Sequence, residues 1–167
     1  MATIKPTIPA TAWIADTASV HGRVTLGEHV SVWFNATIRA EEEPVTVGDR
    51  TNIQDGAVLH ISKGFPCVVG SDVTIGHQAI VHGCTVEDDV LIGMGAIVLD
   101  GACIGRGSIV GAGALVPPGM QVPPGMMVLG VPAKIVGEVK EGQRPLAQFG
   151  VQNYLHHKEA YRRGEYE

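Results

Sequence analysis

The sequence predicts a mainly β protein, a parallel β-helix of six-residue units followed by one C-terminal α-helix. Three observations lead to this fold class. Aliphatic residues recur at every sixth position through most of the chain, glycine is abundant at 22 residues, and only 5% of the residues are aromatic. A period of six matches neither the helical period of 3.6 nor the strand period of 2, but it is the period of a hexapeptide β-helix. Its thin, repetitive interior needs few large side chains.

The repeat defines which side chains face the interior. The positions that follow the period, all Ile, Val or Leu, are Ile14, Val20, Leu26, Val32, Ile38, Val47, Ile53, Leu59, Val69, Ile75, Val81, Val86, Ile92, Val98, Ile104, Val110, Val116 and Val122. Small or β-branched residues stand four positions after most of them, and glycine often follows directly, where the chain must turn. Three units close one triangular coil, which gives about six coils stacked roughly 4.8 Å apart.

The interruptions of the repeat predict the remaining organisation. Three extra residues between Ile38 and Val47, and four between Leu59 and Val69, are expected to form loops that project from the prism. After Val122 the repeat fades. The tail "RPLAQFGVQNYLHHKEAYRR" is typical of an amphipathic helix with a weak point at Gly150. We therefore expect a single domain, with the β-helix over 1–137 and a covering helix over 138–167.

Composition limits the classes of partner. A net charge of −5 disfavours a nucleic-acid-binding protein, which normally presents a basic face. No apolar stretch reaches membrane-spanning length, and the start "MATIKPTIPATAW" lacks the apolar core of a secretion signal. Cys67, Cys84 and Cys103 show no paired spacing and are predicted to be free thiols. A cytoplasmic protein without membrane contact is the expectation.

Three histidines are the candidate functional residues. His60 directly follows the inward Leu59 and His82 directly follows the inward Val81, so both occupy the same place in successive coils. They should stack about 5 Å apart and point outward, with Arg39 in the same column one coil below. His77 lies on another face, around a corner. The three imidazoles can therefore meet only across a subunit boundary, which predicts a homotrimer with shared sites.

Two segments give the chain a family resemblance. The strings "SVWFNATIRAEEEPVTVGDRTNIQDGAVLH" and "VTIGHQAIVHGCTVEDDVLIGMGAIVLDGA" resemble the γ-class carbonic anhydrases. The resemblance implies a left-handed β-helix, although crossover connections are ordinarily right-handed. It also implies a homotrimer whose metal ligands are His60, His77 and His82, one of them from the adjacent subunit, and the reversible hydration of CO2 to bicarbonate.

The resemblance assigns further residues to the site: Arg39, Glu42, Asn52, Gln54, Asp55 and Tyr154. It gives Gln54 contact with the metal-bound solvent. The repeat itself places Asp55 below His77, because Asp55 stands two after Ile53 as His77 stands two after Ile75, and there the carboxylate can orient the imidazole. Purely structural interpretations stay open for several of these residues. Asn52 and Gln54 can hydrogen-bond between coils or at a corner, and Asp55 can hydrogen-bond within its own turn. Glu42 can belong to a solvated acidic loop, and Tyr154 can pack in the core.

Two departures from the family pattern bear on activity. Glu41 stands where the family commonly has aspartate, so an ion pair between subunits is remade or lost. The loop "ISKGFPC" after His60 is short and lacks the carboxylate that shuttles protons in the archetypal enzyme. We therefore expect modest activity.

Three imidazoles and an open position are typical of a catalytic Zn²⁺ site, and histidine alone also accepts Fe²⁺ or Co²⁺. The alternatives are an acyltransferase or a thioesterase acting on acyl-coenzyme A, and a trimeric scaffold with weak catalysis.

Overall fold

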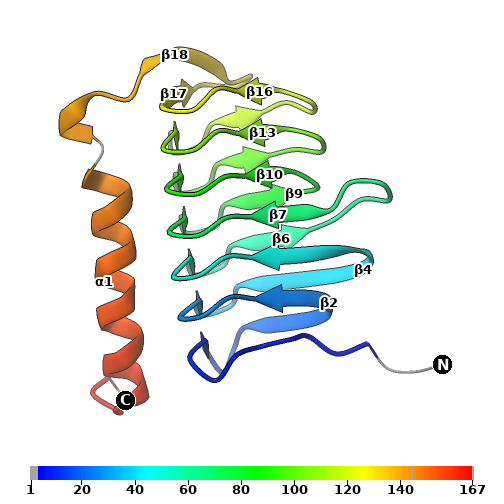
Figure 1. Ribbon diagram of the computed structural model, residues 1–167, viewed down its shortest axis with the longest axis vertical. Helices are drawn as coiled ribbons and strands as arrows, with labels where there is room; N and C mark the ends of the chain where they lie inside the picture. Colours follow the sequence, from blue (N-terminus) through cyan, green and yellow to red (C-terminus); the bar gives the residue numbers. More distant parts are fainter. Residues whose placement is uncertain (1–3, 144, 167) are drawn as a thin grey trace.

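The computed structural model, which describes residues 4–143 and 145–166, is a parallel β-helix of about six coils with one helix beside it (Figure 1). The helix α1, Pro145–Arg162, runs alongside the stack of coils, back toward the N-terminal end of the β-helix. The predicted fold class is confirmed. No helix of the described residues is long and apolar enough to cross a membrane.

The coils have three faces, each built from strands that pair in parallel with the coils above and below. Face 1 contains β1 Trp13–Ile14, β3 Ser31–Val32, β5 Asn52–Ile53, β8 Thr74–Ile75, β11 Leu91–Ile92, β14 Ile109–Val110 and β17 Met126–Leu129. Face 2 contains the first parts of β2 Ser19–Leu26 and β4 Thr37–Val47, then β6 Val58–His60, β9 Ile80–His82, β12 Ile97–Val98 and β15 Leu115–Val116. Face 3 contains the last parts of β2 and β4, then β7 Cys67–Val69, β10 Thr85–Val86, β13 Cys103–Ile104 and β16 Gln121–Val122. The strand β18, Lys134–Glu138, pairs antiparallel with β17, and a short 3₁₀ helix, Glu141–Gln143, leads toward α1.

The interior is filled by the aliphatic residue of each unit. Ile38, Ile53, Leu59 and Ile75 are fully buried, as are alanines near the corners such as Ala57. Each short strand places one side chain inside and its neighbours outside, and every coil repeats that placement at the same height. The interior is therefore a stack of small aliphatic layers, which explains why the chain needs so few aromatic residues.

Two expectations about the repeat were wrong. The insertion after Ile38 is not a separate loop, because it lies within β4; its pairing with β2 stops at Ala40 and resumes at Val45 with a shifted register, so residues 41–44 form a bulge at the corner. The repeat also continues one unit beyond Val122: Val128 stands six residues later, is fully buried and pairs with Val110. Pro123 follows β16, the last strand on its face, so its missing N–H removes no bond to a further coil.

The second insertion is the projecting loop that was predicted. Residues 61–66 leave the prism between β6 and β7 (Figure 1). The loop is closed by a short antiparallel bridge, in which the Phe65 N–H donates to the Ser62 carbonyl at 2.8 Å. The three cysteines are free, as expected, with Cys67 and Cys84 buried.

The helix α1 packs against face 1 and is fixed by glycine, aromatic and lysine contacts. A Cβ on Gly150 would lie 2.7 Å from Thr74 Oγ1, so this glycine permits close approach to the sheet and is not merely a weak point. Further along the helix, the Tyr154 ring packs against Trp33. Lys158 is 1% exposed, and its Nζ donates to the Thr11 carbonyl at 2.9 Å.

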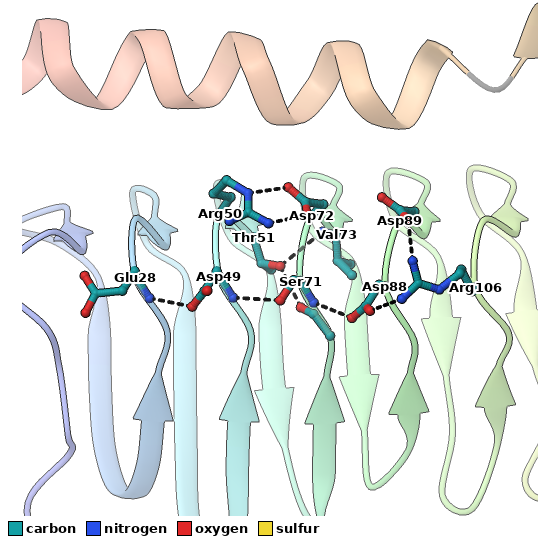
Figure 2. A network of polar contacts seen from close by, with 11 residues as sticks. Glu28, Asp49, Arg50, Thr51, Ser71, Asp72, Val73, Asp88, Asp89 and Arg106 are labelled. Atoms are coloured by element: carbon teal, nitrogen blue, oxygen red, sulfur yellow. Dashed lines mark hydrogen bonds and ion pairs between the residues drawn. The ribbon is translucent and has the colours of Figure 1, made fainter.

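The corner between face 3 and face 1 carries a polar ladder (Figure 2). The Glu28 N–H donates to Asp49 Oδ1 at 2.8 Å, and the Ser71 N–H donates to Asp88 Oδ1 at the same distance. Beside it, Arg50 forms a bidentate ion pair with Asp72, with N–O distances of 2.7 and 2.6 Å. These contacts join one coil to the next at a corner that holds none of the three candidate histidines.

Candidate metal centre

Two of the candidate histidines form a pair at the corner between face 2 and face 3. The strands β6 and β9 are neighbours, and their register places His60 opposite His82. The Nδ1 atom of His60 lies 3.0 Å from the Nε2 atom of His82, and the ring centroids are 5.0 Å apart. The predicted stacking is confirmed, and both rings are partly exposed.

A carboxylate binds the outer nitrogen of each paired ring. Asp100 Oδ1 lies 2.6 Å from His82 Nδ1, and Glu41 Oε2 lies 3.2 Å from His60 Nε2. Glu41 also forms an ion pair with Arg39. The longer glutamate is thus paired within its own chain, with the arginine of the same column.

The neighbouring groups lower the pKa of both carboxyl groups. Desolvation raises the pKa of Asp100, but hydrogen bonds from His82 and Ser62 outweigh it, so the net pKa lies below the usual value. Desolvation likewise raises the pKa of Glu41, and hydrogen bonds from Arg39 and His60 bring the net pKa below the usual value. Both side chains are therefore carboxylates near neutral pH, as acceptors of imidazole hydrogens must be.

The third histidine lies at a different corner, between face 1 and face 2. Asp55 Oδ2 lies 3.0 Å from His77 Nδ1, which is the contact predicted from their equal offsets in successive coils. The Tyr154 hydroxyl of α1 lies 3.2 Å from His77 Nε2. Burial first, and the charge of Asp55 second, raise the pKa of Tyr154 to about 12, so its hydroxyl stays protonated at neutral pH.

The two candidate amides form a chain of hydrogen bonds next to His77. The His77 N–H donates to Gln54 Oε1 at 3.1 Å, and Gln54 Nε2 donates to Asn52 Oδ1 at 3.0 Å. Asn52 Nδ2 then donates to Thr74 Oγ1 at 2.9 Å. Both amides are buried. Asn52 and Gln54 therefore do hydrogen-bond between successive coils, as the sequence left open. These bonds fix the orientation of the Gln54 amide beside the imidazole.

One chain does not bring the three histidines together. Within residues 4–143 and 145–166, no group of three or more His, Cys, Asp or Glu side chains is arranged to hold a metal ion. Glu42 is exposed and makes no side-chain hydrogen bond or ion pair with any described residue. The sequence-predicted residues thus fall into two groups, one around His60 and His82 and the other around His77.

The donor set fits a metal ion. Two nitrogen ligands on a tetrahedral zinc ion, at bond lengths of about 2.0–2.1 Å, lie roughly 3.3 Å apart. The 3.0 Å between His60 Nδ1 and His82 Nε2 is close to that separation. Each of the three imidazoles also has a carboxylate on one nitrogen, the arrangement by which proteins orient metal-binding histidines. His82 is thereby left with Nε2 as the ligand atom and His60 with Nδ1, whereas the Nε2 of His77 lies 3.2 Å from the Tyr154 hydroxyl and would have to give up that contact to bind a metal ion.

A groove of about 420 Å³ adjoins His77 between α1 and the coils. Gln54, Thr74 and Asn153 provide its polar lining. Much of its apolar lining is exposed, notably Met94 at 62% and Phe149 at 70%.

Sequence reasoning missed Asp100. This residue stands two positions after the inward Val98, the same offset at which Asp55 follows Ile53. Counting the unit above His82 in that way would have placed a carboxylate at the corner of the histidine pair.

Comparison with known proteins identifies the family. Residues 83–118 match the family model described as bacterial transferase hexapeptide (six repeats). The chain is 52% identical over 136 residues to a carbonic anhydrase of Geobacillus kaustophilus, covering 81% of this chain and 75% of the relative. It is 49% identical over 128 residues to a probable carbonic anhydrase of Methanocaldococcus jannaschii, covering 77% of this chain and 80% of the relative.

A solved structure titled as a putative acetyltransferase of Bacillus cereus superposes with a TM-score of 0.92 at 42% identity, covering 95% of this chain and 92% of that one. The fold and repeat thus define a hexapeptide-repeat β-helix protein. Relatives also include the mitochondrial gamma carbonic anhydrase 2 of Arabidopsis thaliana, 35% identical over 90% of this chain and 56% of that protein. The chain belongs to the γ-class carbonic anhydrase family.

Proposed function

We propose that this protein catalyses the metal-dependent, reversible hydration of CO2 to bicarbonate at sites shared between the subunits of a homotrimer. The observation that carries the proposal is the set of three outward imidazoles, each bonded to a carboxylate and divided between two corners. His60 and His82 would supply two ligands from one subunit, and His77 of the adjacent subunit would supply the third.

The metal we propose is Zn²⁺, with Fe²⁺ or Co²⁺ as alternatives, because neutral imidazoles accept all three ions. When bound, such an ion acts as a Lewis acid and lowers the pKa of a coordinated water to near 7. The protein's contribution would be to hold each of the three imidazoles in a single tautomer through its carboxylate partner.

The neighbouring amides would position the reactants. Gln54 is held at both ends, by the His77 N–H and by Asn52, so its second Nε2 hydrogen has a fixed direction beside the site. That hydrogen would orient the attacking oxygen, and Asn52, which is buried and bonded to both Gln54 and Thr74, would hold the Gln54 amide in place. Arg39, in the column of His60 and paired with Glu41, would place a positive charge where bicarbonate forms.

Proton removal would limit the rate. The loop 61–66 carries no carboxylate. Glu42 lies exposed on β4 and is the free carboxylate we propose as a partial shuttle, so small buffer molecules should do much of the transfer. We therefore expect modest turnover that rises with imidazole concentration at fixed pH and ionic strength.

The deciding experiment combines stopped-flow CO2 hydration, metal analysis and sedimentation on the same full-length preparation. The proposal expects a trimer with one metal per chain and a buffer-dependent rate. A monomer that binds one metal per chain through all three histidines would refute the shared site. A metal-loaded trimer with no hydration at any buffer concentration would refute the reaction.

Acyl transfer or thioester hydrolysis on acyl-coenzyme A is the second candidate, because the apolar groove beside His77 suits an acyl chain. The Bacillus cereus structure that resembles this chain also carries an acetyltransferase title. A transferase needs only one histidine as base, so it leaves two carboxylate-bonded imidazoles unexplained. Turnover of acyl-coenzyme A by metal-free protein would favour this candidate. A metal-binding trimer inactive in both assays would indicate a scaffold.

A further inference from the structure

We propose that Asp100 is a positioning residue, which fixes the tautomer of His82 so that Nε2 is its ligand nitrogen. The inference rests on the proposed metal site but concerns a residue that the proposed reaction does not use. Its first support is the 2.6 Å contact between Asp100 Oδ1 and His82 Nδ1. A carboxylate only accepts hydrogen bonds, so Nδ1 must carry the hydrogen and Nε2 must present its lone pair.

The local backbone is built to admit this carboxylate. A Cβ on Gly83, the residue after His82, would lie 2.4 Å from Asp100 Oδ1. Gly83 also has a φ of +53°, a conformation that glycine adopts without strain. The coil containing Gly83 is one residue short, between the inward Val81 and Val86. The missing side chain and the tight corner together leave room for Asp100 to reach the imidazole.

The loop after His60 braces the same carboxylate. The Ser62 hydroxyl is among the groups that hold the pKa of Asp100 below its usual value, after His82, so it lies near this carboxylate. The Phe65 ring lies over the next residue, since a Cβ on Gly101 would be 3.1 Å from Phe65 Cε1. This short loop has no carboxylate with which to move protons, but its residues 62 and 65 lie beside Asp100 and Gly101. The loop therefore adds a neighbouring hydroxyl and an aromatic ring to the surroundings of Asp100.

The consequence for a metal ion follows from the distance across the pair. With Nδ1 engaged, His82 Nε2 faces His60 Nδ1 at 3.0 Å, at the mouth of the proposed site. Without Asp100, the ring can hold its hydrogen on either nitrogen, and the Nε2–H tautomer cannot bind a metal until that hydrogen moves. Loss of such an outer partner typically weakens metal binding by about 10- to 100-fold.

The test compares Asp100→Ala with a matched control. Asp72→Asn removes another corner aspartate that pairs with a basic side chain; Asp72 is 29% exposed and Asp100 is 30% exposed. Full-length proteins labelled with ¹⁵N at histidine are freed of metal, and the tautomer of His82 is assigned by long-range ¹H–¹⁵N correlation. Zn²⁺ affinity is then measured by competition with a chelator, and Asp100→Glu serves as the conservative variant.

We expect His82 of the wild type and of Asp72→Asn to hold its hydrogen on Nδ1, and that of Asp100→Ala to populate both tautomers. The Zn²⁺ dissociation constant should rise about 10- to 100-fold in Asp100→Ala, stay unchanged in Asp72→Asn, and recover in part in Asp100→Glu. An unchanged tautomer and affinity in Asp100→Ala would overturn the inference while leaving the proposed function intact. A wild-type protein that takes up no metal, with the Nδ1–H preference lost in Asp100→Ala, would refute the proposed function and keep the positioning role.

Discussion

Gly150→Ala should destabilise the protein, although alanine is the better helix former. In an exposed helix interior this exchange gains about 1 kcal/mol. Here the new Cβ would lie 2.7 Å from Thr74 Oγ1 and 3.4 Å from Thr74 Cγ2. Thr74 is 3% exposed and its hydroxyl accepts a hydrogen bond from Asn52, so the side chain cannot turn away without loss. Overpacking of this kind costs about 1–3 kcal/mol, which leaves a net loss of roughly 0–2 kcal/mol.

A double-mutant cycle with Thr74→Ala isolates the clash from the helix propensity. Thr74→Ala removes both atoms that the new Cβ meets most closely. In that background Gly150→Ala should stabilise the protein by about 1 kcal/mol, so the sign of its effect reverses. The coupling energy between the two substitutions is then about 1–3 kcal/mol, the size of the overpacking penalty.

Urea unfolding, followed by circular dichroism at 222 nm, measures all four proteins. A single protein concentration is needed because association would contribute to the measured stability. If Gly150→Ala stabilised the protein with Thr74 in place, α1 would not approach β8 as closely as the structure shows, and the reasoning would fail. The position of Tyr154, one helical turn further on, gives a second readout through its contact with His77.

Three further predictions concern the site. His60→Ala or His82→Ala should abolish tight metal binding and keep the β-sheet dichroism, because both side chains point outward; retained stoichiometric metal, or a lost sheet signal, would contradict this. Gln54→Ala should lower CO2 hydration by about 10- to 100-fold with metal content unchanged, and a wild-type rate would remove Gln54 from the mechanism. Ultraviolet titration should show Tyr154 ionising near pH 12, a transition that Tyr154→Phe should remove, whereas ionisation of Tyr154 at or below about pH 10 would mean that its hydroxyl is not desolvated.

The sequence alone predicted the solenoid and the stacked pair. A β-helix repeats its interior at a fixed chain separation, so local counting decides which side chains point inward and which residues share a column. That is why the pairing of His60 with His82, and the contact of Asp55 with His77, could be derived from offsets. The same counting extends to Val128, which was missed because the repeat was followed only to Val122, and to Asp100, which was missed because the residue two after Val98 was not compared with the neighbouring column of His82.

Only the tertiary structure decided the contacts that do not repeat. Tyr154 meets His77 across a sequence separation of 77 residues, and no period relates the two positions. The docking of α1 on face 1 brings them together, and that docking depends on the absent side chain of Gly150 and on packing against Trp33. Likewise, only the structure shows that β4 continues through the insertion, with a register shift against β2 at residues 41–44. A periodic sequence determines which residues of successive coils lie opposite one another. The placement of a non-repeating element is instead settled by side-chain packing that no local pattern encodes.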